Sequence, residues 1–330
     1  MARIHTIGIL ACIFVMGVIV ALGPYSHSGM FLEDKGINWY YCKLPERAFW
    51  GQFWAWSLYG LHQVSLWGLI AYAQIKRPKY INGLHPINMI AIGVNLLFVA
   101  LHIVQTKFYY DGLAQDTHVR TSQFSVIFML VFILMMENGR RGLFFGHKVK
   151  FLDEPGGFLR KYHGYYFAWA ITYTFWFHPI EDQLGHLLGT FYTLMLLLQG
   201  SLFFTRAHRD RVWTMLLEVF VLIHGALVAY VSLSSDKWSM FLFGFFTIFV
   251  VTQMHGIGLG NKARWGIVLT YVASLAFVYS GEGTRIAEVI RIPLGEYGLV
   301  FIMAGIIWVP IFIRAKLKSR TVGPMYPEAS

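Results

Sequence analysis

Apolar runs approaching membrane-crossing length recur along the whole chain, and they constrain its fold more than any other feature. A helix needs about 20 apolar residues to cross the hydrocarbon core of a bilayer. Apolar runs lie near residues 5–22, 50–73, 86–104, 122–136, 164–177, 186–204, 213–232, 238–254, 266–280 and 297–313. The sequence therefore predicts an all-α, polytopic transmembrane helix bundle with about ten spans.

The composition agrees with a bilayer as the main solvent. Of the 330 residues, 56% are hydrophobic and only 13% are charged, against about 25% charged residues in a soluble domain. We expect a single integral membrane domain over residues 1–330, with residues 314–330 as a cytoplasmic tail. The first run is similar to a secretory signal peptide, but we expect it to be retained as the first span.

The distribution of charge predicts the orientation. With the N-terminus inside, most of the 27 Lys and Arg residues fall on the inner side, as the positive-inside rule requires. We therefore expect cytoplasmic N- and C-termini, a plasma (inner) membrane location and the lipid bilayer as a constant partner. The net charge of +10 then reflects topology and anionic lipid, which argues against nucleic-acid binding.

Imidazoles and carboxylates gather in two predicted outer loops. The first contains Asp111, Asp116 and His118, and the second begins at His178-Pro179 and continues to His186. A helix that begins at Pro179 would place a carboxylate and an imidazole one turn apart on one face. Such a pair can chelate copper, iron or zinc if a neighbouring loop completes the set. The candidate metal ligands are His178, Asp182, His186, His102 and His118. The alternative is that Glu181 and Asp182 cap a helix while His178 and His186 are interfacial polar residues.

A second constellation comes from different spans and lies towards the middle and the inner side. Ligation of a haem b by two histidines requires one imidazole on each face of the iron, projecting into the bundle. The candidate haem ligands are His62, His163, His224 and His255. The alternative is that each imidazole joins helices through hydrogen bonds to hydroxyl, amide or carbonyl groups.

Glu218 is the strongest single candidate, because the predicted spans place no other carboxylate deep in the membrane. An ionised carboxylate in hydrocarbon is unfavourable, so it should pair with a cation, bind metal or take up a proton. We assign Glu218 a catalytic, proton-moving role. A neutral, hydrogen-bonded structural glutamate is the alternative.

Two further expectations concern the C-terminal third. Pro310 should be tolerated inside a span, because neighbouring helices can satisfy the freed carbonyl. Residues 283–293 predict a short amphipathic helix on the outer surface. Its apolar residues are Ile286, Val289 and Ile290, set against Arg285, Glu288 and Arg291.

Several classes of membrane and soluble enzyme lack their motifs here. The closely spaced His pairs of di-iron desaturases, the zincin motif, the nucleophile elbow and the P-loop are all missing. Every lysine is assigned to a loop or tail, which counts against a retinal protein. Cys12 and Cys42 are the only cysteines, so a cysteine metal site is disfavoured.

Three functions remain. The leading hypothesis is a membrane-embedded oxidoreductase or electron-transfer protein that uses a histidine-ligated metal or haem b and acts on a quinone, lipid or other apolar substrate. The second is a proton-coupled transporter or channel, in which Glu218 and the mid-membrane histidines relay protons. The third is a structural subunit of a membrane complex, whose 17% aromatic residues serve contacts with partner helices and lipid.

Overall fold

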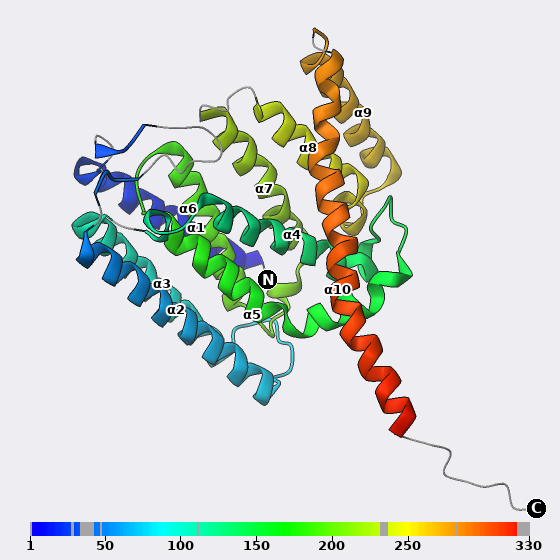
Figure 1. The fold of residues 1–330 in the computed structure, drawn as a ribbon, viewed down its shortest axis with the longest axis horizontal. Coiled ribbons are helices and arrows are strands. Elements are labelled where there is room, and N and C mark those ends of the chain that lie inside the picture. The colour runs from blue at the N-terminus through cyan, green and yellow to red at the C-terminus, as the bar shows by residue number, and fades with distance from the viewer. Residues whose placement is uncertain are drawn as a thin grey trace, which may run out of the picture.

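The protein folds into α-helices joined by short 3₁₀ segments (Figure 1). The computed structural model describes residues 2–27, 30–33, 43–46, 48–110, 112–231, 237–281 and 283–321. Within these ranges the α-helices are α1 (Ala2–Ala21), α2 (Phe49–Lys76), α3 (Pro86–Tyr109), α4 (Val119–Arg141), α5 (Asp153–Phe177), α6 (Leu184–Ser201), α7 (Arg211–Val231), α8 (Trp238–Val251), α9 (Asn261–Val278) and α10 (Arg291–Thr321).

Each predicted apolar run coincides with one of these helices, so the all-helical fold is confirmed. Six stretches of the described chain are long and apolar enough to cross a membrane. They are Arg3–Ala21, Pro86–Tyr109, Val119–Arg141, Arg211–Val231, Trp238–Gly256 and Arg285–Arg314. This result is compatible with a membrane protein. The predicted total of about ten spans and the predicted orientation stay predictions. Asp111 and Cys42 lie outside the described residues.

Helix α5 lies at the centre of the bundle. It packs against α2, α4 and α6, while α3 covers α2, α1 covers α6, and α7 lies between α6 and α8. Trp176 and Phe177, at the C-terminal end of α5, have no exposed surface. Large aromatic side chains bury the most apolar area per residue, so this end of α5 anchors the core.

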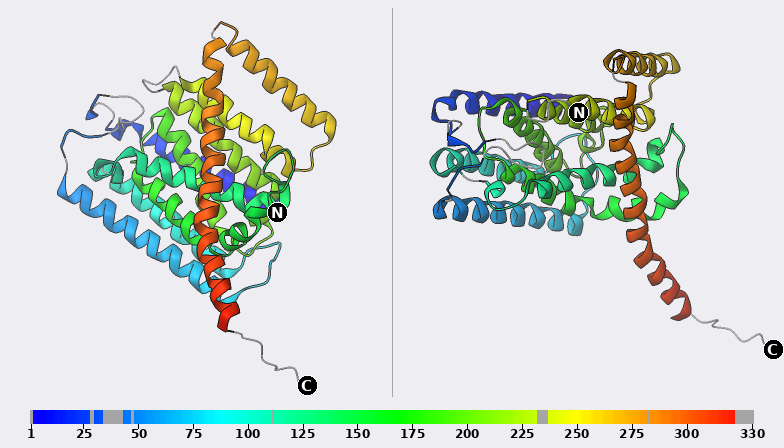
Figure 2. Two further views of the ribbon diagram at one scale, coloured as in Figure 1. Left: turned by 45° about the vertical axis from the view of Figure 1, so that its right-hand side comes forward. Right: turned by 45° about the horizontal axis from the view of Figure 1, so that its top comes forward.

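Helices α9 and α10 are attached at the edge of this bundle. Figure 2 shows α10 crossing the other helices obliquely, with its C-terminal half running clear of them. It packs on α4, α5 and α8, whereas α9 contacts mainly α8 and has no buried residue. Pro310 lies inside α10, as expected. The helix continues to Thr321, so the first part of the predicted tail is helical.

The segment before α10 is helical, and it buries one of its charged side chains. Residues Gly283–Ile290 form a 3₁₀ helix, η8, in which Ile286 and Ile290 are exposed and Glu288 is buried. Exposed apolar side chains such as Ile286 and Ile290 can face lipid in an interfacial helix, so the predicted amphipathic surface helix stays a prediction. Glu288 is buried because Oε1 accepts hydrogen bonds from Tyr279 Oη at 3.0 Å and Ser239 Oγ at 3.3 Å. These bonds offset its desolvation.

Candidate functional site

The four candidate haem ligands are spread over the bundle. His62 is on α2, His163 on α5, His224 on α7 and His255 on the short 3₁₀ helix Gln253–Gly256. His163 Nδ1 bonds the Arg160 carbonyl, and His255 Nε2 bonds the Val250 carbonyl. The structure does not bring these four residues together, so haem ligation stays a prediction to which the geometry adds no support.

His62 belongs to a buried hydrogen-bond chain that joins four helices. Its Nε2 donates to Asn95 Oδ1 at 2.7 Å, and its Nδ1 accepts from Trp176 Nε1 at 3.2 Å. Asn95 Nδ2 donates in turn to Ser201 Oγ at 2.8 Å, and Ser201 Oγ donates to the Leu197 carbonyl. Both nitrogens of His62 are therefore satisfied by protein, which fits the joining role better than metal ligation.

His102 and His118 have local structural roles. His102 Nε2 lies 3.1 Å from the Phe175 carbonyl and 3.0 Å from the His178 carbonyl. An N–H here satisfies carbonyls that the end of α5 leaves open. His118 is the N-cap of α4, where its Nδ1 accepts from the Arg120 amide at 3.1 Å.

Two of the candidate outer ligands do meet. The rings of His178 and His186 lie 5.8 Å apart between centroids. Burial lowers the pKa of His178 well below its usual value, and the nearby imidazoles of His186, His224 and His102 lower it further. His178 is thus neutral at pH 7, with one nitrogen able to donate and one able to accept a proton.

The predicted position of Asp182 on a helix is wrong. Helix α6 begins at Leu184 with Gln183 as its N-cap, so Asp182 precedes the helix and shares no helical face with His186. Its Oδ2 lies against Gly23, where an added Cβ would come within 2.7 Å. Among the described residues, no three His, Cys, Asp or Glu side chains converge as a metal ion would require.

Glu181 holds this loop in place, which the sequence did not reveal. Its carboxylate has no exposed surface and accepts from Lys107 Nζ at 2.7 Å. His27 Nδ1 lies 3.1 Å from its other oxygen. The alternative in which Glu181 caps a helix is therefore wrong, because Glu181 serves as the buried counter-ion of Lys107 and α6 begins only at Leu184. The signal was hidden by the 74 residues that separate Glu181 from Lys107.

Glu218 is buried in an ion pair with Arg141, the last residue of α4. Arg141 Nη1 lies 3.0 Å from Glu218 Oε1, and Nη2 lies 2.8 Å from Oε2. The chain turns away directly after Arg141 at Gly142, whose φ is 73° and where a Cβ would lie 2.4 Å from the Gly146 backbone. Glycine at this turn thus helps direct Arg141 inward towards α7. Pairing with a cation was one of the outcomes expected for Glu218.

A row of ionisable side chains continues from this ion pair along the contact between α6 and α7. Tyr192 is buried on α6 and stacks on Phe220 of α7, with 5.3 Å between the ring centroids. Its ring centroid is 6.3 Å from that of His224. His224 packs over Gly189, where a Cβ would lie 3.1 Å from Cε1, and His224 Nδ1 is buried without a hydrogen-bond partner among the described residues.

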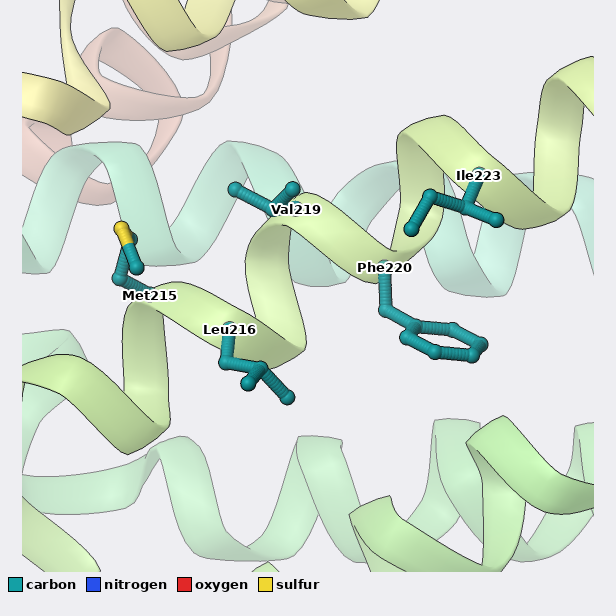
Figure 3. A pocket seen from close by; sticks show the side chains of 5 residues that line it. All are labelled: Met215, Leu216, Val219, Phe220 and Ile223. Carbon is teal, nitrogen blue, oxygen red and sulfur yellow. The ribbon is translucent and has the colours of Figure 1, made fainter.

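A shallow apolar groove of about 360 Å³ follows another side of α7. Figure 3 shows its side chains at positions i, i+1, i+4, i+5 and i+8 of the helix. They are Met215, Leu216, Val219, Phe220 and Ile223. All five are apolar, so the groove suits a hydrocarbon chain. A quinone head would need donors for its carbonyl oxygens, and these five side chains supply none.

A further carboxylate lies inside a candidate membrane span. Glu296 is on α10, is 5% exposed, and falls inside the candidate span Arg285–Arg314. The expectation that Glu218 alone is deeply placed is therefore wrong. The predicted apolar run began at residue 297, whereas the helix begins at Arg291.

No known protein family, curated protein or solved structure matches this chain.

Proposed function

We propose that this protein is a proton-conducting membrane protein, a proton-coupled transporter or channel, with its pathway along the contact between α6 and α7. The observation that carries the proposal is a series of ionisable groups in which His178 lies beside His186 and His224 lies beside Tyr192, with Glu218 further along α7. Ionisable groups are costly at membrane depth, and those that persist mark ion or proton pathways.

The order of these groups follows the helices from the outer to the inner side. His186 is near the start of α6, and Tyr192 lies about 9 Å further along it at 1.5 Å per residue. His224 and Glu218 are separated by the same length on α7, which runs the opposite way. Neutral imidazole and phenol groups can each donate and accept a proton. The proposed pathway requires water between successive groups, since these gaps are too long for direct hydrogen bonds.

The Arg141–Glu218 pair would form the inner end of this pathway. A carboxylate that is held by a guanidinium can receive a proton only when the pair loosens, so the pair would act as the gated step. Proton transfer to Glu218 would then free Arg141 to bind a second anionic group. In a transporter this ion pair would open when Glu218 takes up a proton, whereas a purely structural ion pair would stay closed.

The test measures proton flux in liposomes that contain the purified protein and a pH-sensitive dye, under a potassium diffusion potential. We expect wild-type protein to acidify the lumen faster than protein-free vesicles do. Glu218→Gln should reduce the excess flux at least tenfold, whereas Glu137→Gln, at a surface pair with Arg140, should leave it unchanged. Equal flux in wild type, Glu218→Gln and empty vesicles would refute the proposal.

Because Glu218→Gln leaves Arg141 buried without its counter-ion, a loss of folding must be separated from a loss of conduction. Removing one member of a buried pair is far more destabilising than removing both. The double variant Arg141→Gln/Glu218→Gln should therefore regain thermal stability without regaining proton flux. Recovery of flux in this double variant would show that Glu218 does not carry the proton.

The redox hypothesis is separated by a different measurement. Metal analysis of the detergent-solubilised protein, with absorption spectra before and after dithionite, would detect copper, iron, zinc or a reduced haem band. A stoichiometric metal that is lost in a His178→Ala/His186→Ala variant would favour the oxidoreductase. A structural subunit of a membrane complex would instead tolerate replacement of Tyr192, His224 and Glu218 without loss of activity.

A further inference from the structure

Glu296 lies on a face of α10 whose other side chains are apolar and packed against neighbouring helices. Ile292 packs closely on Gly244 of α8, where an added Cβ would lie 2.9 Å from the Ile292 side chain. Residues four apart share a helix face, so Glu296 follows Ile292 in a row with Val300 and Ala304, which have no exposed surface. A carboxyl group therefore stands within a stripe that is otherwise part of the core.

In the described part of the chain, the cations on the elements around Glu296 are engaged elsewhere or, like Arg291 and Lys150, exposed. Helix α8 contains no charged residue. Arg285 on η8 lies 3.4 Å from Glu288, and Arg141 on α4 is paired with Glu218. Arg140 binds Glu137 and the Gly256 carbonyl, and Arg160 on α5 bonds the Met136 carbonyl. Glu296 Oε2 itself is buried without a hydrogen-bond partner among the described residues.

The neighbouring hydroxyl is already engaged. Tyr297 Oη lies 2.7 Å from Thr252 Oγ1, and Thr252 Oγ1 also bonds the Leu143 carbonyl. An ionised carboxylate without a cation or donor in this apolar contact would be very costly, whereas a neutral carboxyl costs much less.

We propose that Glu296 is a proton-binding site, a neutral carboxylic acid buried between α8 and α10 that reacts with apolar carbodiimides. The carboxyl oxygen bonds the carbodiimide carbon while its proton moves to a nitrogen, and an acyl shift then gives a stable N-acylurea. Nothing leaves, so the residue gains the mass of one reagent molecule. The site is separate from the α6–α7 pathway and does not depend on it.

The test treats the folded wild-type protein near neutral pH with dicyclohexylcarbodiimide and locates the adduct by peptide mass spectrometry. We expect labelling at Glu296 that declines as pH rises, and much weaker labelling by a water-soluble carbodiimide. Glu288 is the matched control, because it is equally buried, at 5% exposed, but bonded to Tyr279 and Ser239. It should stay unlabelled, as should Glu218 with its arginine.

Either of two results would overturn the inference. One is that Glu296 stays unlabelled in the folded protein but becomes labelled after the protein is denatured in mild acid. The other is equal labelling of Glu296 and Glu288. The labelling needs no transport activity, so its outcome is independent of the flux measurement. A labelled Glu296 in a protein without proton flux would support this site and refute the proposed pathway.

Discussion

At the scale of single residues, the buried polar side chains divide into those that are fully bonded and those that are not. Trp176, His62, Asn95 and Ser201 form a chain in which every donor has an acceptor. His224 Nδ1 and Glu296 Oε2 are buried without such partners in the described part of the chain. Groups of the first kind stabilise the fold, whereas the second kind remain available for protons.

Asn95 is the residue on which the bonded chain depends, because it accepts from His62 and donates to Ser201. Asn95→Ala leaves the buried His62 Nε2–H without its acceptor, at a cost of about 1–3 kcal/mol for such a group, while Ser201 Oγ keeps its bond to the Leu197 carbonyl. We expect a clear fall in the midpoint of thermal unfolding in detergent. Ser65→Ala removes an exposed bond to the Leu61 carbonyl and should shift the midpoint little. An unchanged midpoint for Asn95→Ala would contradict the role of the chain.

Residue-level prediction from sequence succeeded in finding chemically unusual positions and failed in assigning their partners. The depth of Glu218 was recognisable because a carboxylate within an apolar run is conspicuous. Its partner Arg141 was not, since the two are 77 residues apart. The helix start at Pro179 was expected from local propensity, but Lys107 and His27 hold the loop through Glu181 and move the start to Leu184. Such tertiary contacts leave no local signal.

At the scale of elements, the close contact of α6 and α7 positions the proposed pathway. Gly189→Ala places a methyl group 3.1 Å from His224 Cε1, so the imidazole must shift. Gly200 lies on the same helix with nothing within 4 Å of its Cβ position. Alanine in an exposed helix position is favoured over glycine by roughly 0.5–1 kcal/mol.

We therefore expect opposite effects from the two glycine variants. Gly189→Ala should lower both the thermal midpoint and proton flux, whereas Gly200→Ala should raise the midpoint slightly and leave flux unchanged. Thermal scans and flux assays on the same preparations would measure both quantities. Similar behaviour of the two variants would show that His224 does not depend on Gly189.

Element positions were predictable because the apolar runs are long and separated by Pro, Gly and charged residues. The burial of Glu288 in η8 was not predictable, because periodicity alone cannot show that Glu288 finds donors in Tyr279 and Ser239. Likewise, the extension of α10 to Arg291 was hidden by Pro293, which is acceptable in the first turn of a helix.

At the scale of the whole molecule, the predicted topology places the loop before α5 inside and the segment after α9 outside. Lys148 and Gly281 are exposed positions in these two regions. In a background with both native cysteines replaced, an impermeant maleimide applied to intact cells should label Gly281→Cys. It should label Lys148→Cys only after the membrane is opened.

The reverse pattern would place the termini outside the cell. Labelling of both positions in intact cells, or of neither, would mean that an even number of crossings separates them. Helix α9 lies between the two labelled positions, so the labelling pattern also depends on whether α9 crosses the membrane. The charge distribution predicts the first pattern, since Lys and Arg concentrate on the side assigned to the cytoplasm.

The central claim is that protons pass along α6 and α7, and Tyr192 tests it with the smallest change. Tyr192→Phe removes one hydroxyl and keeps the ring that stacks on Phe220 at 5.3 Å. Tyr230→Phe makes the same change at an exposed position on α7. In proteoliposomes with an imposed potential, we predict that Tyr192→Phe loses at least tenfold in proton flux while Tyr230→Phe matches wild type. Wild-type flux in Tyr192→Phe would contradict the pathway.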